Sequence, residues 1–167
     1  GEVDPANSVR MLKQYSVDGV IVASSTLPVS FAEAFDSAGV PVVHCFGRHS
    51  ETPRVNTLGI NNFAAGQLAA ETLLARGYEK IAFMGGPKSA TSTQDRCDGF
   101  IAALQTRSVN HSISYASAYS FEAGRAEMLR LIEAGPAQAY FCGDEVLSIG
   151  ALSAAQSFGL SVPQDIG

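Results

Sequence analysis

The feature that most constrains the fold is a regular alternation of short apolar runs with longer helical stretches. The apolar runs are bounded by glycine, proline or small polar residues, as β-strands are. They span residues 20–23, 40–45, 57–60, 80–85 and 137–142, and a further predicted strand, over residues 113–119, alternates between polar and apolar residues. Helices are predicted over residues 5–16, 29–38, 63–76, 93–106, 121–134 and 145–158. Strands that alternate with helices of this length indicate βαβ units, so the sequence predicts an α/β fold with parallel sheets.

Composition narrows the classes of function. The 167 residues carry a formal net charge of −5 and contain no basic run, which argues against general attraction of this part of the chain to nucleic acid. No apolar stretch is long enough to cross a bilayer, so no membrane partner is expected. Cys45, Cys97 and Cys142 have no paired spacing, which indicates buried, reduced thiols in a cytoplasmic protein. The histidines are scattered singly, so neither a metal site nor a cofactor is predicted.

The chain carries no recognised catalytic motif. It has no phosphate-binding glycine loop, no nucleophile elbow and no paired metal-binding histidines on a helix. Two acids, Asp144 and Glu145, are adjacent, so their side chains would point in different directions and would make a poor acid–base pair around one bond. The sequence therefore predicts a protein that is not an enzyme.

The most informative run for function covers residues 139–154. It consists of a short apolar strand, the polar turn Gly143-Asp144-Glu145 and a helix of small residues. Open α/β sheets bind ligands outside the carboxyl ends of their strands, and a helix begins at this point. This turn is therefore a candidate wall of a ligand site.

Seven stretches occur in the order in which one protein family carries them. Among them are Val17-Asp-Gly-Val-Ile-Val-Ala23, Asn61-Asn62-Phe-Ala-Ala-Gly66 and the run just described. The full set spans residues 17–23, 39–43, 61–66, 74–82, 96–100, 139–154 and 159–166. Together they cover nearly the whole chain and resemble the effector-binding domain of LacI/GalR-family transcriptional regulators.

The resemblance implies a periplasmic-binding-protein-like fold of type I, with two Rossmann-like parallel-sheet subdomains and ligand in the cleft between them. Residues 1–57 would form part of the N-terminal subdomain and residues 58–167 most of the C-terminal one. The family's opening strand, its final crossing strands and its DNA-binding helix-turn-helix have no counterpart here, so the fold is expected to be incomplete.

The resemblance also implies a set of ligand-binding residues. Arg96 falls on the family's cleft arginine, where a planar guanidinium can grip vicinal hydroxyls or a carboxylate; the alternative is an ion pair with Asp95 or Asp98. Tyr119 lies where relatives often carry an aromatic, which can stack on a sugar ring or base and hydrogen-bond through its phenol. Ordinary packing at a strand end is the alternative for Tyr119.

Four further residues follow from the same comparison. Asp144 would accept hydrogen bonds from ligand hydroxyls, with capping of the helix as the alternative, whereas Glu145 more simply serves the helix. Ser24 and Thr93 offer hydroxyl contacts, with a plain turn as the alternative for Ser24. Phe46 stands where many relatives place an aspartate, and it offers a stacking face instead.

These expectations describe the effector-sensing core of a LacI-type regulator. Its partner would be a sugar, sugar acid or similar small molecule, and binding would alter the affinity of a homodimer for operator DNA. Operator DNA would be contacted only through a helix-turn-helix domain outside this chain. The alternative is a periplasmic sugar-binding protein of an ABC transporter, which shares the fold.

Overall fold

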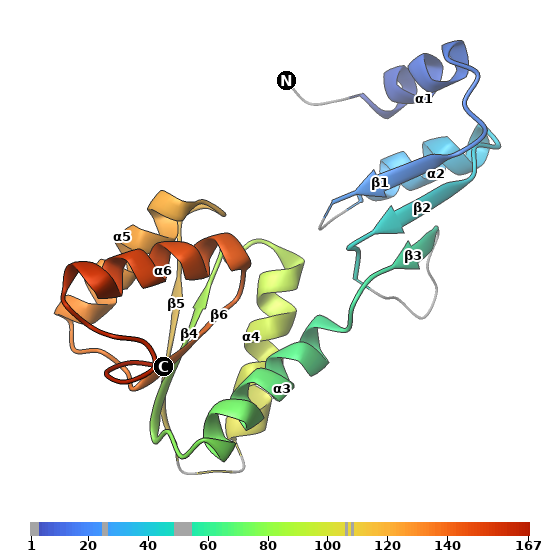
Figure 1. Cartoon of the computed structure of the whole chain (residues 1–167). Helices are drawn as coiled ribbons and strands as arrows, with labels where there is room; N and C mark the ends of the chain where they lie inside the picture. Colours follow the sequence, from blue (N-terminus) through green and yellow to red (C-terminus); the bar gives the residue numbers. More distant parts are fainter. Residues whose placement is uncertain (1–3, 25–26, 49–54, 106, 108) are drawn as a thin grey trace. The chain divides into compact units, whose positions relative to one another are not determined.

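The computed structural model describes residues 4–24, 27–48, 55–105, 107 and 109–167. They form two compact units, Gly1–Asn61 and Asn62–Gly167, each with its own parallel sheet (Figure 1). No helix in these ranges combines the length and the apolar character needed to cross a membrane.

The first unit is a small sheet with a helix packed against it. Its elements are α1 (Pro5–Gln14), β1 (Val20–Ala23), α2 (Val29–Ser37), β2 (Val42–Cys45) and β3 (Asn56–Leu58). The strands pair in the order β1-β2-β3, and both pairings are parallel. Ala32 and Phe35 of α2 are buried, as are Val42 and His44 on alternate positions of β2. This alternation places one face of β2 against the core.

The second unit holds the larger core. Its elements are α3 (Asn62–Ala75), β4 (Lys80–Gly85), α4 (Thr91–Leu104), β5 (Asn110–Tyr115), α5 (Phe121–Glu133), β6 (Ala139–Cys142) and α6 (Glu145–Ser157). The parallel strands run in the order β5-β4-β6, which places the most buried strand in the middle. The predicted α/β fold with parallel sheets is confirmed in both units.

Helices cover both faces of this sheet. On one face α3 and α4 pack around Ile81, Phe83 and Phe100, which have no exposed surface (Figure 1). On the other face α5 and α6 pack around Met84 and Leu147, which are equally buried. Successive residues of β4 thus supply two separate cores, because strand side chains alternate between faces. A strand buried on both faces accounts for the continuous apolar run over residues 81–85, after exposed Lys80.

Glycines let α3 and α4 approach each other closely. A β-carbon built on Gly99 of α4 would lie 1.9 Å from the carbonyl oxygen of Phe63, and one on Gly66 of α3 would lie 2.0 Å from the carbonyl oxygen of Arg96. Backbone atoms cannot retreat as a flexible side chain can, so both positions require glycine. The close crossing fixes the position of α4 along α3. It therefore also fixes the position of the side chains on the first turns of α4.

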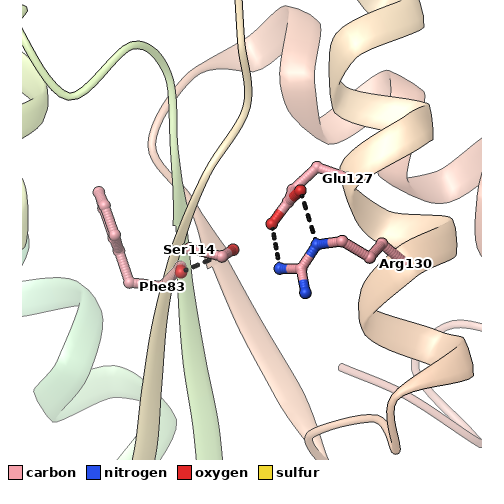
Figure 2. Close-up of polar contacts among 4 residues, drawn as sticks. All are labelled: Phe83, Ser114, Glu127 and Arg130. Carbon is pink, nitrogen blue, oxygen red and sulfur yellow. Dashed lines mark hydrogen bonds and ion pairs between the residues drawn. The ribbon is translucent and has the colours of Figure 1, made fainter.

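Polar contacts in the second unit join two neighbouring strands and, separately, two side chains of one helix (Figure 2). Ser114 of β5 is buried and donates its hydroxyl to the carbonyl oxygen of Phe83 on β4 at 3.4 Å. On α5 the guanidinium of Arg130 donates to both carboxylate oxygens of Glu127, at 2.6 and 3.1 Å. The Arg130 side chain is 60% exposed, so solvent screens this pair and it contributes little to stability.

One predicted strand ends earlier than the sequence indicated. Residues 113–119 alternate between polar and apolar, but β5 spans Asn110–Tyr115 and the chain then bends. The backbone N–H of Ala116 makes the last ladder bond, to the carbonyl oxygen of Gly85 at 2.8 Å, where β4 itself ends. Since β4 provides no ladder beyond Gly85, Tyr119 lies in the loop that leads to α5.

Candidate functional site

The carboxyl ends of β4, β5 and β6 meet at one edge of the second sheet, and four of the predicted site residues lie there. Tyr119 follows β5, Asp144 follows β6, and α4 supplies Thr93 and Arg96 one turn apart. Because parallel strands all end at the same edge, three loops distant in sequence converge there. The other two predicted residues, Ser24 and Phe46, belong to the first unit, where they follow β1 and β2.

Arg96 bridges two elements of the second unit. Its Nε donates to the side-chain oxygen of Asn62, the first residue of α3, at 2.9 Å, and its Nη1 donates to the carbonyl oxygen of Gly143. Asn62 is buried and Gly143 is the residue before Asp144. These bonds use two of the five N–H donors of the guanidinium, so further donors remain on a side chain that is only partly buried. Arg96 therefore holds the turn that carries Asp144 and retains donors for another acceptor.

Tyr119 and Thr93 form a pair. The phenol oxygen of Tyr119 lies 2.6 Å from Oγ1 of Thr93, a short distance for a bond between two hydroxyls. Thr93 is 3% exposed, whereas Tyr119 is 41% exposed. The ring lies over Gly86, in the loop after β4: a β-carbon there would come within 2.2 Å of Cε1 of the ring. An aromatic face is thus presented at the edge of the sheet from a fixed position.

Asp144 caps α6. Its Oδ1 accepts from the backbone N–H of Val146 at 3.0 Å, and its own backbone is extended, as an N-cap residue requires. Glu145 is exposed in the first turn, where its charge complements the helix dipole. A carboxylate has several acceptor positions on two oxygens, so capping through Oδ1 leaves Oδ2 of Asp144 able to accept a ligand hydroxyl.

The thiols near this edge are held protonated. Burial raises the pKa of Cys142, at the end of β6, to about 11. Burial also raises the pKa of Cys97, and the hydrogen bond with the Tyr115 hydroxyl at 3.4 Å only partly opposes this. Because the thiolate is the reactive form, neither side chain is suited to nucleophilic chemistry at neutral pH. Among the described residues no three His, Cys, Asp or Glu side chains gather as metal ligands would.

At the corresponding edge of the first unit, Ser24 is paired with a histidine that sequence reasoning left aside. Nε2 of His44 lies 2.9 Å from the carbonyl oxygen of Ser24 and 3.1 Å from its hydroxyl. Since a carbonyl only accepts, this nitrogen carries the proton. His44 is 6% exposed, and a β-carbon on Gly47 would fall 2.4 Å from its Nδ1. The strand sequence Val42-Val-His-Cys45 does not alternate between apolar and polar residues, so no signal in it identified His44 as an inward-facing residue.

Phe46 is the most exposed of the predicted site residues. It is 69% exposed and has a φ of 67°, in the left-handed region that residues other than glycine seldom adopt. Its backbone N–H donates to the carbonyl oxygen of Leu58 at 2.8 Å, which holds the backbone at the end of β3. The exposed ring is available as a stacking surface on the first unit.

Parallel α/β units with polar and aromatic side chains at the carboxyl edge define the class of open-sheet ligand-binding proteins. The model of one family, described as periplasmic binding proteins and the sugar binding domain of the LacI family, matches residues 1–167. The chain belongs to this family, which confirms the resemblance found in the sequence.

Individual relatives are transcriptional regulators. The HTH-type transcriptional repressor PurR of Edwardsiella ictaluri (strain 93-146) is 32% identical over 160 residues, which are 93% of this chain and 47% of the repressor. The chain therefore spans about half the length of the curated relatives it matches.

The chain is also similar to solved structures of transcriptional regulators. A regulatory protein of the LacI family from Chloroflexus aggregans is 25% identical with a TM-score of 0.83, over 100% of this chain and 62% of that one. A structure named as a complex of the transcriptional regulator CelR with cellobiose is 27% identical with a TM-score of 0.81, over 98% of this chain and 51% of that one.

Proposed function

We propose that this chain is the effector-sensing core of a LacI-type transcriptional regulator. The observation that carries the proposal is the carboxyl edge of the second sheet, where Arg96, Tyr119 and Asp144 converge from three separate elements in a chain of this family. The two units would correspond to the family's N-terminal and C-terminal subdomains. The effector would be a sugar or a close derivative, as the family description suggests.

Each side chain has a role suited to a polyol. Asp144 accepts from ring hydroxyls through Oδ2, and Arg96 donates to hydroxyl or carboxylate oxygens through the N–H groups that its structural contacts leave over. Tyr119 offers its ring to the apolar face of the sugar. Ser24 and Phe46 are the candidate hydroxyl and aromatic contacts that the first unit itself carries. A donor, an acceptor and a stacking face together favour a hydroxylated ring over a purely anionic or purely apolar molecule.

The regulatory step is a shift in population. An effector that binds one arrangement of the complete protein more tightly than another moves the equilibrium toward the first, and the operator affinity of a homodimer changes with it. DNA would be contacted by a helix-turn-helix segment such as the one named in the curated relatives. With this function the protein would bind its effector without converting it chemically, and it would act in the cytoplasm.

A second candidate is a periplasmic sugar-binding protein, because the family description also covers that class. The curated relatives and the solved structures compared above are regulators, which favours the first function.

Calorimetric titration with sugars and DNA-binding measurements on the complete natural protein distinguish the regulator from the sugar-transport protein. We expect cellobiose, a free monosaccharide or a sugar acid such as gluconate to bind, and an operator fragment from the protein's own promoter to be bound with an affinity that the same sugar changes. Sugar binding with no affinity for any promoter fragment would favour the transport protein. Binding of none of these small molecules would refute both functions.

A further inference from the structure

We propose that Thr93 and Gly86 are positioning residues for Tyr119, and that Tyr119 recognises its ligand through the ring and not through the hydroxyl. This rests on the proposed function and narrows the ligand to a molecule with an apolar face, such as the face of a pyranose ring. It also assigns to Thr93 a supporting role in place of a direct ligand contact.

The first step of the argument is the burial of Thr93. At 3% exposure its hydroxyl is out of reach of a ligand, and its partner is the phenol of Tyr119 at 2.6 Å. The sequence suggested Thr93 as a ligand contact because a hydroxyl one turn before Arg96 would line the same edge. In the folded chain that hydroxyl is already engaged by the phenol of Tyr119.

The second step is the close contact between the Tyr119 ring and Gly86. A β-carbon on Gly86 would lie 2.2, 2.6 and 2.7 Å from Cε1, Cζ and Cδ1 of Tyr119. These are three consecutive ring atoms, so the side of the ring rests directly on the backbone of Gly86. Any other residue there would push the ring away from the end of β4, because no side chain fits at such distances.

The third step combines the two contacts. The contact with Gly86 restrains one side of the ring, and the hydrogen bond to Thr93 restrains the phenol end. Both side-chain torsions of Tyr119 are therefore set before a ligand binds. A side chain ordered in advance loses little rotational freedom on binding, which favours affinity. The phenol oxygen is engaged by buried Thr93 although Tyr119 as a whole is 41% exposed, and this leaves the ring as the part of the side chain that a ligand would meet.

A mutant cycle on the complete protein tests the pairing, with calorimetric titration of cellobiose as the probe. Thr93→Val and Tyr119→Phe each remove one side of the same hydrogen bond, and each should weaken binding about three- to tenfold. The double variant should bind no more weakly than either single variant, since the bond can be lost only once. Thr93→Ser should bind as the wild type does, and Gly86→Ala should weaken binding more than Thr93→Val.

Controls separate positioning from damage to the fold. Thr72→Val makes the same chemical change on α3, where the hydroxyl donates to the carbonyl of Leu68 within its own helix at 2.7 Å, and it should leave cellobiose affinity unchanged. Additive effects in the cycle, or a loss in Tyr119→Phe that Thr93→Val does not share, would overturn the proposal by showing that the phenol bonds to the sugar directly.

A measurement without ligand distinguishes failure of this inference from failure of the proposed function. In the complete protein labelled with ¹³C-tyrosine, the Tyr119 ring signals are identified by their loss in Tyr119→Phe. They should shift or broaden in Thr93→Val and Gly86→Ala but not in Thr93→Ser or Thr72→Val. Unchanged signals in Thr93→Val would refute the positioning role whatever the protein binds, whereas the expected shifts without sugar binding would refute only the proposed ligand.

Discussion

Replacement of Arg96 by alanine should destabilise the protein in the absence of any ligand. The substitution removes donors from two acceptors, the side-chain oxygen of buried Asn62 and the carbonyl oxygen of Gly143. A hydrogen bond to a charged group contributes about 1.5–3 kcal/mol, and a buried acceptor left without a partner costs about 1–3 kcal/mol. Arg96 is only partly buried, so water can replace part of the loss. We expect the free energy of unfolding to fall by about 2–4 kcal/mol.

Urea denaturation followed by far-ultraviolet circular dichroism measures this difference, with a second arginine as the matched control. Arg130→Ala removes the same side chain from an exposed pair with Glu127 and should cost less than about 1 kcal/mol. Asn62→Ala should cost less in the Arg96→Ala background than alone, because the two residues share a bond. Equal stabilities of Arg96→Ala and Arg130→Ala would refute the bridging role and leave Arg96 as a ligand contact only.

Two further outcomes follow from the same edge of the sheet. Asp144→Ala removes the cap of α6 and should lower the free energy of unfolding by about 1 kcal/mol. Asp144→Asn keeps an oxygen for the N–H of Val146, so it should leave stability nearly unchanged while it weakens binding of a neutral sugar. Urea denaturation and calorimetry of the two variants check this, and equal stabilities of the two would contradict the capping role. Cys142, with its pKa raised from 9.0 to about 11, should be alkylated by iodoacetamide at pH 7.5 about 100-fold more slowly than an ordinary thiol and should speed up as the pH rises toward that value. Mass spectrometry of the Cys142 peptide follows the reaction, and a rate that levels off below pH 9 would show that the thiol is not shielded.

The sequence predicted where a residue lies in the fold best when that position depends on its place along a strand. Ser24 directly follows one apolar run and Asp144 follows another after a single glycine, and such residues lie at the carboxyl edge of a parallel sheet. The helix-capping alternative for Asp144 also required only its place before a helix of small residues. Local order along the chain was sufficient for these assignments.

Contacts between distant segments could not be read in this way. Arg96 bonds to residues 34 and 47 positions away, and the pairing of Thr93 with Tyr119 spans 26 positions. The alternation over residues 113–119 indicated a strand, but β5 ends at Tyr115 because β4 provides no ladder beyond Gly85. The burial of His44 likewise depends on which face of β2 meets α2.

The sequence alone determined the class of fold, the family and the sheet edge at which its candidate residues lie, because periodicity, turn residues and strand ends are local properties. Only the tertiary structure decided what each side chain at that edge is free to do. α3 packs closely on α4, and Tyr119 packs closely on Gly86. In this arrangement Thr93 hydrogen-bonds to Tyr119, and one N–H group of Arg96 donates to the carbonyl oxygen of Gly143. These hydrogen bonds depend on distances between segments that are far apart in the sequence, and the sequence pattern does not specify those distances.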